Sequence, residues 1–403
     1  MVGRLVIIGG GMAAGRLLEA LAEAGSDWKV TLINAEPRGT YNRIMLSPVL
    51  AGEKSYPEIV THDDAWYRAR GVACHFGARV TDIDRAAQTV TLASGTAIGY
   101  DRLVIATGAM PLIPPMPGAD LEGVIAYRDL EDTERMMGLG AGTRAVVIGG
   151  GLLGLEAAAG MASRGVSVTV VHRNSHLLDR QLDPAAAGLL QRDLEARGIR
   201  VLTSAMTQEI RGEVGQARAL VLEDGTELPC DLLVMAAGIR PNIALAEAAG
   251  LACARGILVD AQMRSSDPAI LAIGECIEFD GQTFGLVAPV FDHALVAADT
   301  LLGRRTAYAI KEVSAKLKVT GCDLFSAGDF EARPGREEIV LHDPLRRRYR
   351  RLVIENDRII GIVLYGDTAD GTWFFNMMRD GTEIAPLRDT LIFGPAYQPE
   401  QAA

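Results

Sequence analysis

Two glycine-rich segments of this chain have the spacing that lets a backbone loop bind a pyrophosphate. They are Arg4–Gly15, RLVIIGGGMAAG, and Arg144–Ala158, RAVVIGGGLLGLEAA. In each, an apolar run meets three glycines and then a helical pattern rich in Ala and Leu, which is the context that a dinucleotide fingerprint requires. Phosphates are expected at the helix N-terminus, where the free N–H groups and the helix dipole favour negative charge.

Individual positions within each segment have different expected roles. The first glycine makes the tight turn, the next but one lets a pyrophosphate approach the bare backbone, and a small residue three positions later keeps the helix close to the strand. These residues are Gly9, Gly11 and Ala14 in the first segment and Gly149, Gly151 and Gly154 in the second. Glycines that merely turn the chain are the alternative, but the repetition of the whole strand–turn–helix pattern argues against it.

The strand that follows each segment indicates which ribose could be bound. Trp28–Arg43 places Glu36 about where a ribose-binding acid is expected, and a solvated loop carboxylate is the alternative. The second unit instead carries His172 and Arg173 at the end of Val166–Asn174. An acid would repel a 2′-phosphate and these side chains would not, so NADPH is allowed, although a neutral His172 can also hydrogen-bond a ribose. NADH and NADPH therefore both stay open.

Three further apolar strands end in small residues. The meander of Gly77–Ala109 ends at Ala106-Thr107-Gly108, and the hairpin-then-strand pattern of Gly212–Asn242 closes at Ala237-Gly238. Later, Gly274-Glu275 follows a short apolar strand, and its carboxylate could accept a ribityl hydroxyl; an ordinary turn is the alternative. The helix expected over Val290–Leu302 would cover that site, with His293 as a packed or solvated histidine rather than a base.

These elements predict an α/β fold with two nested Rossmann-like dinucleotide-binding domains and a small α+β C-terminal domain. The first dinucleotide-binding domain is expected over 1–112 and 237–310, the second over 113–236, and the C-terminal interface domain over 311–403. The proline-rich stretch Pro111–Pro117 marks the first boundary, and alternating strands followed by an aromatic helix around Trp373–Met378 mark the last domain.

Composition narrows the class of protein. With 403 residues, 49% of them hydrophobic and 23% charged, the sequence predicts a soluble globular protein. A net charge of −11 argues against nucleic acid or a membrane surface as a partner, the apolar runs are too short to cross a bilayer, and the early first strand leaves no room for a secretory leader. We expect a cytoplasmic location. No metal site, Fe–S cluster or redox disulfide is expected, because the five cysteines are scattered: Cys74, Cys230, Cys253, Cys276 and Cys322.

Although the chain as a whole has a net negative charge, a cluster of basic residues lies near the C-terminus. It consists of Arg346, Arg347, Arg348, Arg350 and Arg351. A solvated strand face is one interpretation of such a cluster. A docking patch for an acidic redox partner is the other.

Several segments carry a resemblance that covers nearly the whole chain. They are YNRIMLSPVLAGE from Tyr41, VIGGGLLGLEAA from Val147, DRQLD from Asp179, AAGIRPN from Ala236, AIGEC from Ala272, KLKVTGCDLFSAGDF from Lys316 and GDTADGTWF from Gly366. In this order they resemble the FAD/NAD(P)H pyridine-nucleotide reductases. More narrowly, they resemble the flavoprotein part of assimilatory nitrite reductase large subunits and the electron-transfer subunit of some assimilatory nitrate reductases; rubredoxin and ferredoxin reductases are more distant relatives.

The resemblance implies a ligand for each domain. It implies FAD at Gly9, Gly11, Ala14, Glu36, Arg43, Ala106, Thr107, Gly108, Arg128, Gly274 and Glu275. It implies NADH or NADPH at Gly149, Gly151, Gly154, Glu156, His172, Arg173 and Gly238. Glu156 is the candidate catalytic residue, positioning flavin and nicotinamide. Related ferredoxin reductases pair this glutamate with the lysine of a Leu-Ser-Lys motif, whereas this chain has Leu46-Ser47-Pro48, so Glu156 needs another partner.

The function implied is electron transfer from NAD(P)H through FAD to a separate protein, in nitrate or nitrite assimilation. A rubredoxin or ferredoxin is the alternative acceptor, and an NAD(P)H-sensing flavoprotein regulator is the alternative from another class. Full nitrite reductase large subunits continue into Fe–S and sirohaem domains, so the chain ending at Ala403 is not expected to reduce nitrite itself. A homodimer is compatible with the resemblance.

Overall fold

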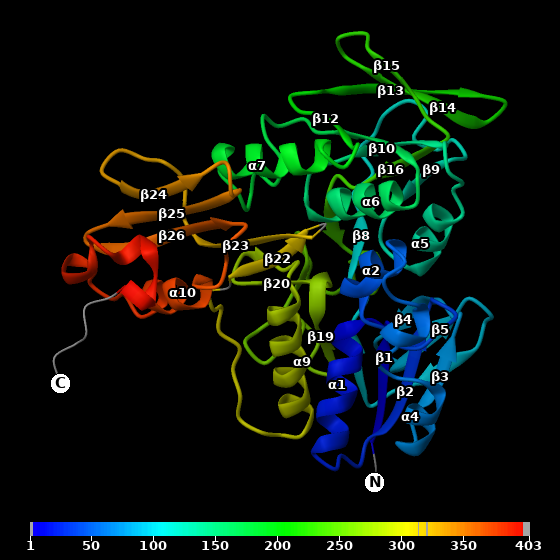
Figure 1. Ribbon diagram of the computed structural model, residues 1–403. Helices are drawn as coiled ribbons and strands as arrows, with labels where there is room; N and C mark the ends of the chain where they lie inside the picture. Colours follow the sequence, from blue (N-terminus) through cyan, green and yellow to red (C-terminus); the bar gives the residue numbers. More distant parts are fainter. Residues whose placement is uncertain (1–2, 313, 320, 398–403) are drawn as a thin grey trace. The chain divides into compact units, whose positions relative to one another are not determined.

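The computed structural model describes residues 3–312, 314–319 and 321–397 (Figure 1). The chain forms two compact units, of which the first contains Met1–Leu112 and Ile239–Lys311 and the second contains Ile113–Gly238 and Glu312–Ala403. Each unit contains a five-stranded parallel sheet. The predicted α/β class with two Rossmann-like halves is therefore confirmed.

The parallel sheet of the first unit has the strand order β19-β7-β1-β2-β3. Its strands are β1 (Arg4–Ile8), β2 (Lys29–Asn34), β3 (Ala73–Phe76), β7 (Arg102–Ile105) and β19 (Ile270–Ala272). Helix α1 (Met12–Glu23) packs against α9 (Val287–Leu301), and the two lie side by side in Figure 1. Leu5, Ile7 and Leu103 are fully buried in the sheet, as expected for a parallel sheet whose strands are continuous apolar runs.

Smaller elements complete the first unit. They are η1 (Arg43–Met45), α2 (Leu46–Leu50), α3 (Tyr56–Ile59), α4 (Asp64–Ala69), β4 (Val80–Asp84), β5 (Thr89–Leu92), β6 (Ala97–Gly99), β8 (Ala109–Pro111), β17 (Ile239–Pro241), α8 (Ala244–Ala248), β18 (Ile257–Leu258), η2 (Gly274–Cys276), β20 (Ile277–Phe279) and β21 (Gln282–Thr283). The expected antiparallel meander is the sheet β4-β5-β6. Strands β8 and β17 pair with each other where the chain leaves and re-enters this unit.

The second unit repeats the parallel design in the order β12-β11-β10-β16-β9. The elements of this half are β9 (Val124–Ala126), α5 (Leu130–Met137), β10 (Arg144–Ile148), α6 (Leu152–Ser163), β11 (Ser167–Val171), α7 (Pro184–Glu195), β12 (Arg200–Leu202), β13 (Thr207–Glu213), β14 (Gln216–Leu222), β15 (Glu227–Pro229) and β16 (Leu232–Met235). Helix α7 begins at Pro184, because Asp183 caps it and Pro184 takes its first position, where no N–H is needed.

The C-terminal part of the second unit is an antiparallel sheet in the order β22-β23-β26-β25-β24. Its elements are β22 (Ala315–Val319), β23 (Cys322–Gly328), β24 (Glu337–Asp343), β25 (Arg348–Glu355), β26 (Arg358–Tyr365), α10 (Gly371–Arg379), η3 (Ala385–Leu387), η4 (Leu391–Phe393) and η5 (Pro395–Tyr397). Phe325, Leu352 and Phe374 form its core, which confirms the small sheet with an aromatic helix.

Both interpretations of the arginine cluster are wrong for Arg350 and Arg351. Arg350 is buried and pairs with Asp367 at 3.0 Å and Asp370 at 2.9 Å. Strand β25 lies between two other strands and covers a core, so alternate side chains point to opposite buried faces. Arg350 and Arg351 thus lie on opposite buried faces of one sheet, whereas Arg346, Arg347 and Arg348 are exposed at the turn and the start of β25.

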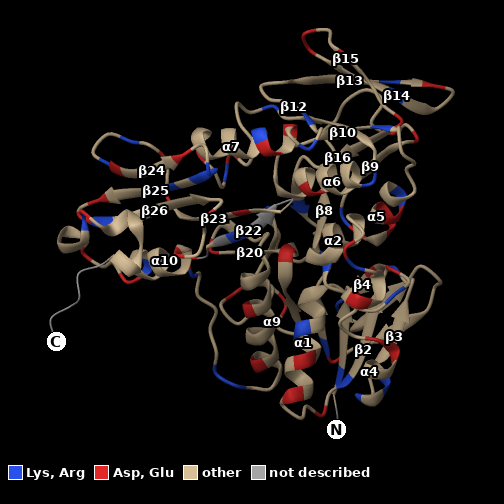
Figure 2. Cartoon of the chain, in the orientation of Figure 1, with Lys and Arg blue, Asp and Glu red and all other residues tan. Residues whose placement is uncertain are grey.

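Side chains on the other face of β25 contact the N-terminal end of helix α7. Both elements carry charged residues (Figure 2). Arg351 is buried and pairs with Glu338 at 2.7 Å and with Asp183, the N-cap of α7, at 3.1 Å. The Tyr349 hydroxyl donates to the same Asp183 carboxylate at 2.7 Å. A second aspartate of this helix, Asp193, is paired with Arg347 and accepts from Tyr365. Charges that look like a surface feature in the sequence therefore fasten α7 to the C-terminal sheet.

His293 lies inside the first unit on helix α9. Its side chain is fully buried, its ring centroid lies 4.6 Å from those of both Phe284 and Tyr308, and neither ring nitrogen has a hydrogen-bond partner within the described residues. Burial lowers the pKa of His293 from 6.5 to about 4, so the folded protein holds this ring neutral. His293 is packed rather than solvated.

We expect His293 to make the first unit sensitive to acid. Between its folded pKa of about 4 and its unfolded value of 6.5, the unfolded chain binds a proton that the folded chain does not. The free energy of unfolding therefore rises with pH in this window, by up to about 1.4 kcal/mol per pH unit, and His293→Leu removes this term. Urea unfolding followed through Trp28 and Trp66, in a Trp373→Phe background, measures it; parallel pH profiles for the two proteins would contradict the assignment.

Candidate functional site

The first glycine loop connects β1 to α1 and leaves the helix N-terminus open. Gly9 has a φ of +108°, and a Cβ at this position would clash with the carbonyl oxygen of Ala106. Gly11 is the N-cap of α1 in an extended conformation, and no described atom lies within 4 Å of a Cβ built on it. The first turn after Gly11 carries no acidic side chain. The space beside Gly11 at the helix N-terminus is therefore open, so that a pyrophosphate could approach the backbone there.

Asn34 at the end of β2 holds this loop in place. Its side-chain oxygen accepts the N–H of Gly10 at 3.2 Å, and its amide nitrogen donates to the carbonyl of Arg38 at 2.8 Å. Through these two bonds the buried Asn34 side chain links the glycine loop to the turn that carries Glu36. Ala14 is fully buried on the inner face of α1. No sequence pattern singled out this bond between Asn34 and Gly10.

Glu36 lies on this turn in a small polar cluster. One carboxylate oxygen accepts from the Tyr41 hydroxyl at 2.8 Å, and the other is paired with Arg43. The Arg43 guanidinium also lies over the Tyr41 ring, 5.2 Å from its centroid. Two predicted FAD-binding residues are thus in direct contact, and Arg43 orients the carboxylate. Each oxygen keeps a lone pair that can accept a ribose hydroxyl.

The ends of β7 and β19 bring further predicted residues to the same loop. The Thr107 hydroxyl donates to the carbonyl of Asn242 at 2.8 Å, and Gly108 has a φ of +66°. A Cβ built at Gly274 would lie 3.1 Å from that of Ala13, so the Gly274-Glu275 turn lies against the first turn of α1. All predicted FAD residues except Arg128 therefore lie in the first unit. Arg128 lies in the second unit, where its backbone N–H donates to Asp132 at 2.8 Å.

The second glycine loop, between β10 and α6, reproduces the first. Gly149 has a φ of +125°, and a Cβ there would clash with the carbonyl oxygen of Ala236. No described atom comes within 4 Å of a Cβ built on Gly151, the N-cap of α6. A Cβ at Gly154 would clash with the carbonyl oxygen of Gly149, which explains why this position needs glycine. The second helix N-terminus also presents bare N–H groups.

The register of the two sheets identifies equivalent positions after the second strand. Ile8 pairs with Ile33 as Ile148 pairs with Val171, and each pair lies at the ends of strands that flank a glycine loop. The equivalent residues beyond these pairs are Asn34 with His172 and Glu36 with Asn174. The sequence pattern indicated His172 and Arg173 for this place rather than Asn174. Only the strand register shows that Asn174 takes the place of Glu36.

His172 performs the same task as Asn34. Its Nδ1 accepts the N–H of Gly150 at 3.1 Å, so in the neutral ring the proton lies on Nε2. Burial lowers the pKa of His172, which keeps the ring neutral at pH 7. Arg173 is exposed. One nitrogen of His172 is therefore occupied in holding the loop, and its Nε2–H remains for another group.

The loop that joins β11 to α7 packs onto the glycine loop. The N–H of Leu178 donates to the carbonyl of Gly150 at 2.9 Å, and Leu177 and Leu178 are fully buried. Farther along, Gly238 follows β16 with a φ of +122° and no described atom within 4 Å of a built Cβ. Glu156 lies half-buried on the second turn of α6. All predicted nicotinamide-nucleotide residues lie in the second unit.

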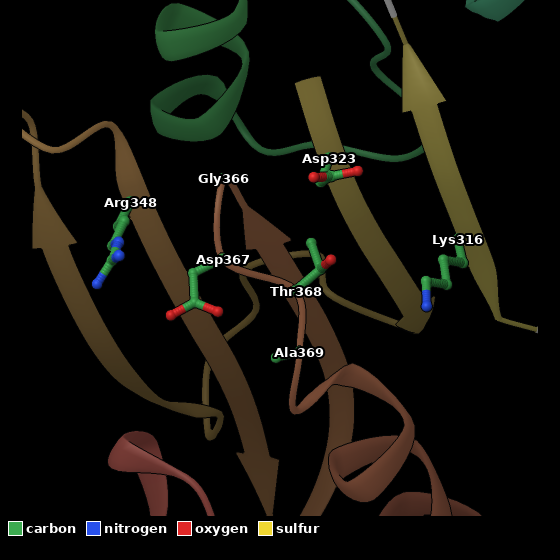
Figure 3. A pocket seen from close by; sticks show the side chains of 7 residues that line it. All are labelled: Lys316, Asp323, Arg348, Gly366, Asp367, Thr368 and Ala369. Carbon is green, nitrogen blue, oxygen red and sulfur yellow. The ribbon is translucent and has the colours of Figure 1, made fainter. Parts of the chain in front are cut away.

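A pocket of about 440 Å³ lies in the C-terminal sheet (Figure 3). Its lining contains none of the predicted site residues and consists of Lys316, Asp323, Arg348, Gly366, Asp367, Thr368 and Ala369. Lys316 and Arg348 lie on opposite sides of the loop that carries Thr368, and Asp367 is paired with Arg350. The pocket is thus a separate feature from the two glycine loops.

The described residues also bear on metal binding and on membrane-spanning helices. Among them, no group of three or more His, Cys, Asp or Glu side chains could hold a metal ion, and all five cysteines are free thiols. The helices of residues 3–312, 314–319 and 321–397 include none long and apolar enough to span a membrane.

Comparisons with known proteins bear out the resemblance found in the sequence. Residues 3–300 match the family model for pyridine nucleotide-disulphide oxidoreductases, and residues 314–382 match that for the rubredoxin NAD+ reductase C-terminal domain. Two Bacillus subtilis proteins are similar over 98% of this chain: an NAD(P)H nitrite reductase, 39% identical, and an assimilatory nitrate reductase electron transfer subunit, 38% identical. These alignments cover 49% and 52% of the relatives, so the chain spans about half the length of the curated relatives it matches.

The fold has similar solved structures as well. The ferredoxin reductase for the CYP199A2 system from Rhodopseudomonas palustris is 30% identical, with a TM-score of 0.81. The similarity covers 92% of this chain and 93% of that one.

Two glycines of the second loop should respond differently to the same substitution. Gly154→Ala places a methyl group against the Gly149 carbonyl and should lower the free energy of unfolding of the second unit by about 2 kcal/mol. Gly151→Ala, at an allowed φ of −83° with open space around it, should cost less than about 1 kcal/mol. Urea unfolding followed through Trp373 measures both; equal losses would contradict the close helix–loop contact.

Proposed function

The chain belongs to the pyridine nucleotide-disulphide oxidoreductase family, and on this premise we propose that it is an FAD-dependent NAD(P)H reductase that passes electrons to a separate acceptor. One observation carries the proposal. Two helices of 12 residues each begin at an extended glycine with open space before it, and each follows a parallel strand. The chain thus has two pyrophosphate cradles, one for each dinucleotide.

The residues of the first unit fit FAD. Backbone N–H groups at Gly11 would bind the pyrophosphate, and Glu36, oriented by Arg43, would accept hydroxyls of the adenosine ribose. Glu275, on the turn beside α1, would accept a ribityl hydroxyl. When bound, FAD supplies the ability to accept a hydride and to release electrons singly. The protein supplies position, because a reaction between held partners avoids the entropy cost of bringing them together.

The second unit fits NADH or NADPH. Its Gly151 loop would bind the second pyrophosphate, and the open backbone at Gly238 would admit the nicotinamide end of the nucleotide. We assign Glu156, half-buried on α6, to positioning the nicotinamide against the flavin. The five free thiols include no pair with the Cys-x-x-Cys spacing of a redox disulfide, so electrons leave without a relay through paired protein thiols.

A nitrate- or nitrite-reducing protein or module is the acceptor that we favour. Two curated relatives, which match this chain over 98% of its length, carry nitrite reductase and nitrate reductase electron transfer in their names. A rubredoxin or ferredoxin is the second candidate, favoured by the match of residues 314–382 to a rubredoxin reductase domain and by the ferredoxin reductase structure.

Substitution of one glycine in each loop should affect FAD binding and NAD(P)H binding separately. Gly11→Leu fills the space before α1 and should yield colourless protein that does not take up added FAD, because the side chain blocks the pyrophosphate. Gly151→Leu should retain the yellow flavin and weaken NAD(P)H binding at least about 100-fold. Flavin absorbance and a stopped-flow titration of flavin reduction measure these outcomes. A yellow, fully loaded Gly11→Leu protein would contradict the assignment of the first loop.

Turnover tests the activity itself. With ferricyanide as acceptor, the protein should oxidise NAD(P)H rapidly, with two ferricyanide ions reduced per nucleotide because each accepts one electron. A long-lived reduced complex that gives no electrons to ferricyanide, ferredoxin or rubredoxin would instead support an NAD(P)H sensor. The measurement is the decrease of NAD(P)H absorbance with and without each acceptor.

A further inference from the structure

The second unit lacks a carboxylate where the first unit has one. Glu36 follows the second strand of the first unit, whereas Asn174, a neutral amide, lies at the equivalent place. His172 and Arg173, the residues before it, are not acids either. A ribose whose hydroxyls need an anionic acceptor would therefore find none at the end of β11.

The following loop brings a carboxylate back to this place. One oxygen of Asp179 accepts a hydrogen bond from the Asn174 side chain at 2.7 Å. Its other oxygen lies 3.5 Å from Nε2 of His172, the nitrogen that carries the proton. Asp179 thus contacts Asn174, which takes the place of Glu36, and also His172, which holds the glycine loop. Its side chain remains one-third exposed, so the carboxylate is accessible to a ligand.

The position of Asp179 is fixed relative to the glycine loop. The preceding residue, Leu178, donates its N–H to the carbonyl of Gly150, and Gly150 in turn donates to His172. Leu177 and Leu178 are fully buried, so the loop is anchored by its core side chains as well as by its backbone. Gly150, a residue of the glycine loop itself, therefore holds the Asp179 carboxylate beside that loop through Leu178.

We infer that Asp179 is the residue that determines nucleotide specificity, accepting the adenosine 2′-hydroxyl of NADH and repelling the 2′-phosphate of NADPH. The inference rests on the proposed function, because it takes the second cradle as the NAD(P)H site. A carboxylate discriminates in this direction because it accepts from a hydroxyl but opposes a dianionic phosphate. Arg173, an exposed cation at the same strand end, is the competing determinant.

Binding of NAD+ and NADP+ to the flavin-loaded protein tests the role of Asp179. Isothermal titration should show that wild-type protein binds NAD+ at least about tenfold more tightly than NADP+. Asp179→Asn should reduce that ratio about tenfold, mainly by tightening NADP+ binding, since it removes the repulsion and keeps the side-chain size. Asp179→Glu, which keeps the charge, should retain the preference for NAD+.

Matched controls separate specificity from damage to the loop. Glu223→Gln removes the same charge from an exposed position of the same unit and should leave the ratio unchanged. Protection of the Leu178 amide from hydrogen exchange should persist in Asp179→Asn, which reports an intact loop. Arg173→Gln should change the ratio less than Asp179→Asn does.

Several results would overturn the inference. They are a wild-type preference for NADP+, an unchanged ratio in Asp179→Asn, or a loss of preference in Asp179→Glu as large as that in Asp179→Asn. An Arg173→Gln variant that selectively loses NADP+ affinity would assign specificity to Arg173 instead. Protein that binds neither nucleotide would contradict the proposed function itself, and so is distinguished from these outcomes.

Discussion

The close approach of each glycine loop to the carbonyl oxygen that ends a neighbouring strand is the constraint on which the rest of the structure depends. At Gly9 and Gly149 the space that a Cβ would need is taken by the carbonyl oxygens of Ala106 and Ala236, and both glycines have positive φ values. This conformation turns the chain sharply from a buried strand into a helix. The helix N-terminus is thereby presented at the carboxyl ends of the strands, where the other groups that we propose for ligand binding also lie.

A side chain from the second strand stabilises each loop by the same kind of bond. Asn34, the last residue of β2, accepts from Gly10, and His172, the residue after β11, accepts from Gly150. The two residue types differ, but both offer an acceptor to one buried backbone N–H, which would be costly to leave unpaired. In the second unit, this use of His172 removes one of its nitrogens from ligand binding. The polar groups that remain for a ligand at the second glycine loop therefore differ from those at the first, although both loops have the same strand–turn–helix arrangement.

The features that could be predicted from the sequence are those encoded over short distances. The two glycine motifs are contiguous in the sequence: one contains Gly9 and Gly11, and the other contains Gly154. Two further pairs, Thr107-Gly108 and Gly274-Glu275, directly follow apolar runs, so the local pattern was enough to place them at strand ends. The fold class followed from the repetition of this pattern.

The features that the sequence did not show depend on contacts between distant segments. Asp183 meets Arg351 across 168 positions, and no local pattern marks either residue as buried. The arginine cluster consequently resembled an exposed patch. Likewise, the equivalence of Asn174 and Glu36 requires the strand register, and the return of Asp179 requires the path of a loop without regular secondary structure.

Helix α7 carries one more consequence for how this chain could be divided. Asp183 and Asp193, near its two ends, are buried against Tyr349 and Tyr365 of the C-terminal sheet, although the bonded residues are 166 and 172 positions apart in the sequence. A truncated chain without that sheet would leave both carboxylates in water and the inner face of α7 uncovered. The parallel-sheet half of the second unit therefore depends on the C-terminal sheet for the burial of α7, and the two pieces have to be kept together or both aspartates replaced.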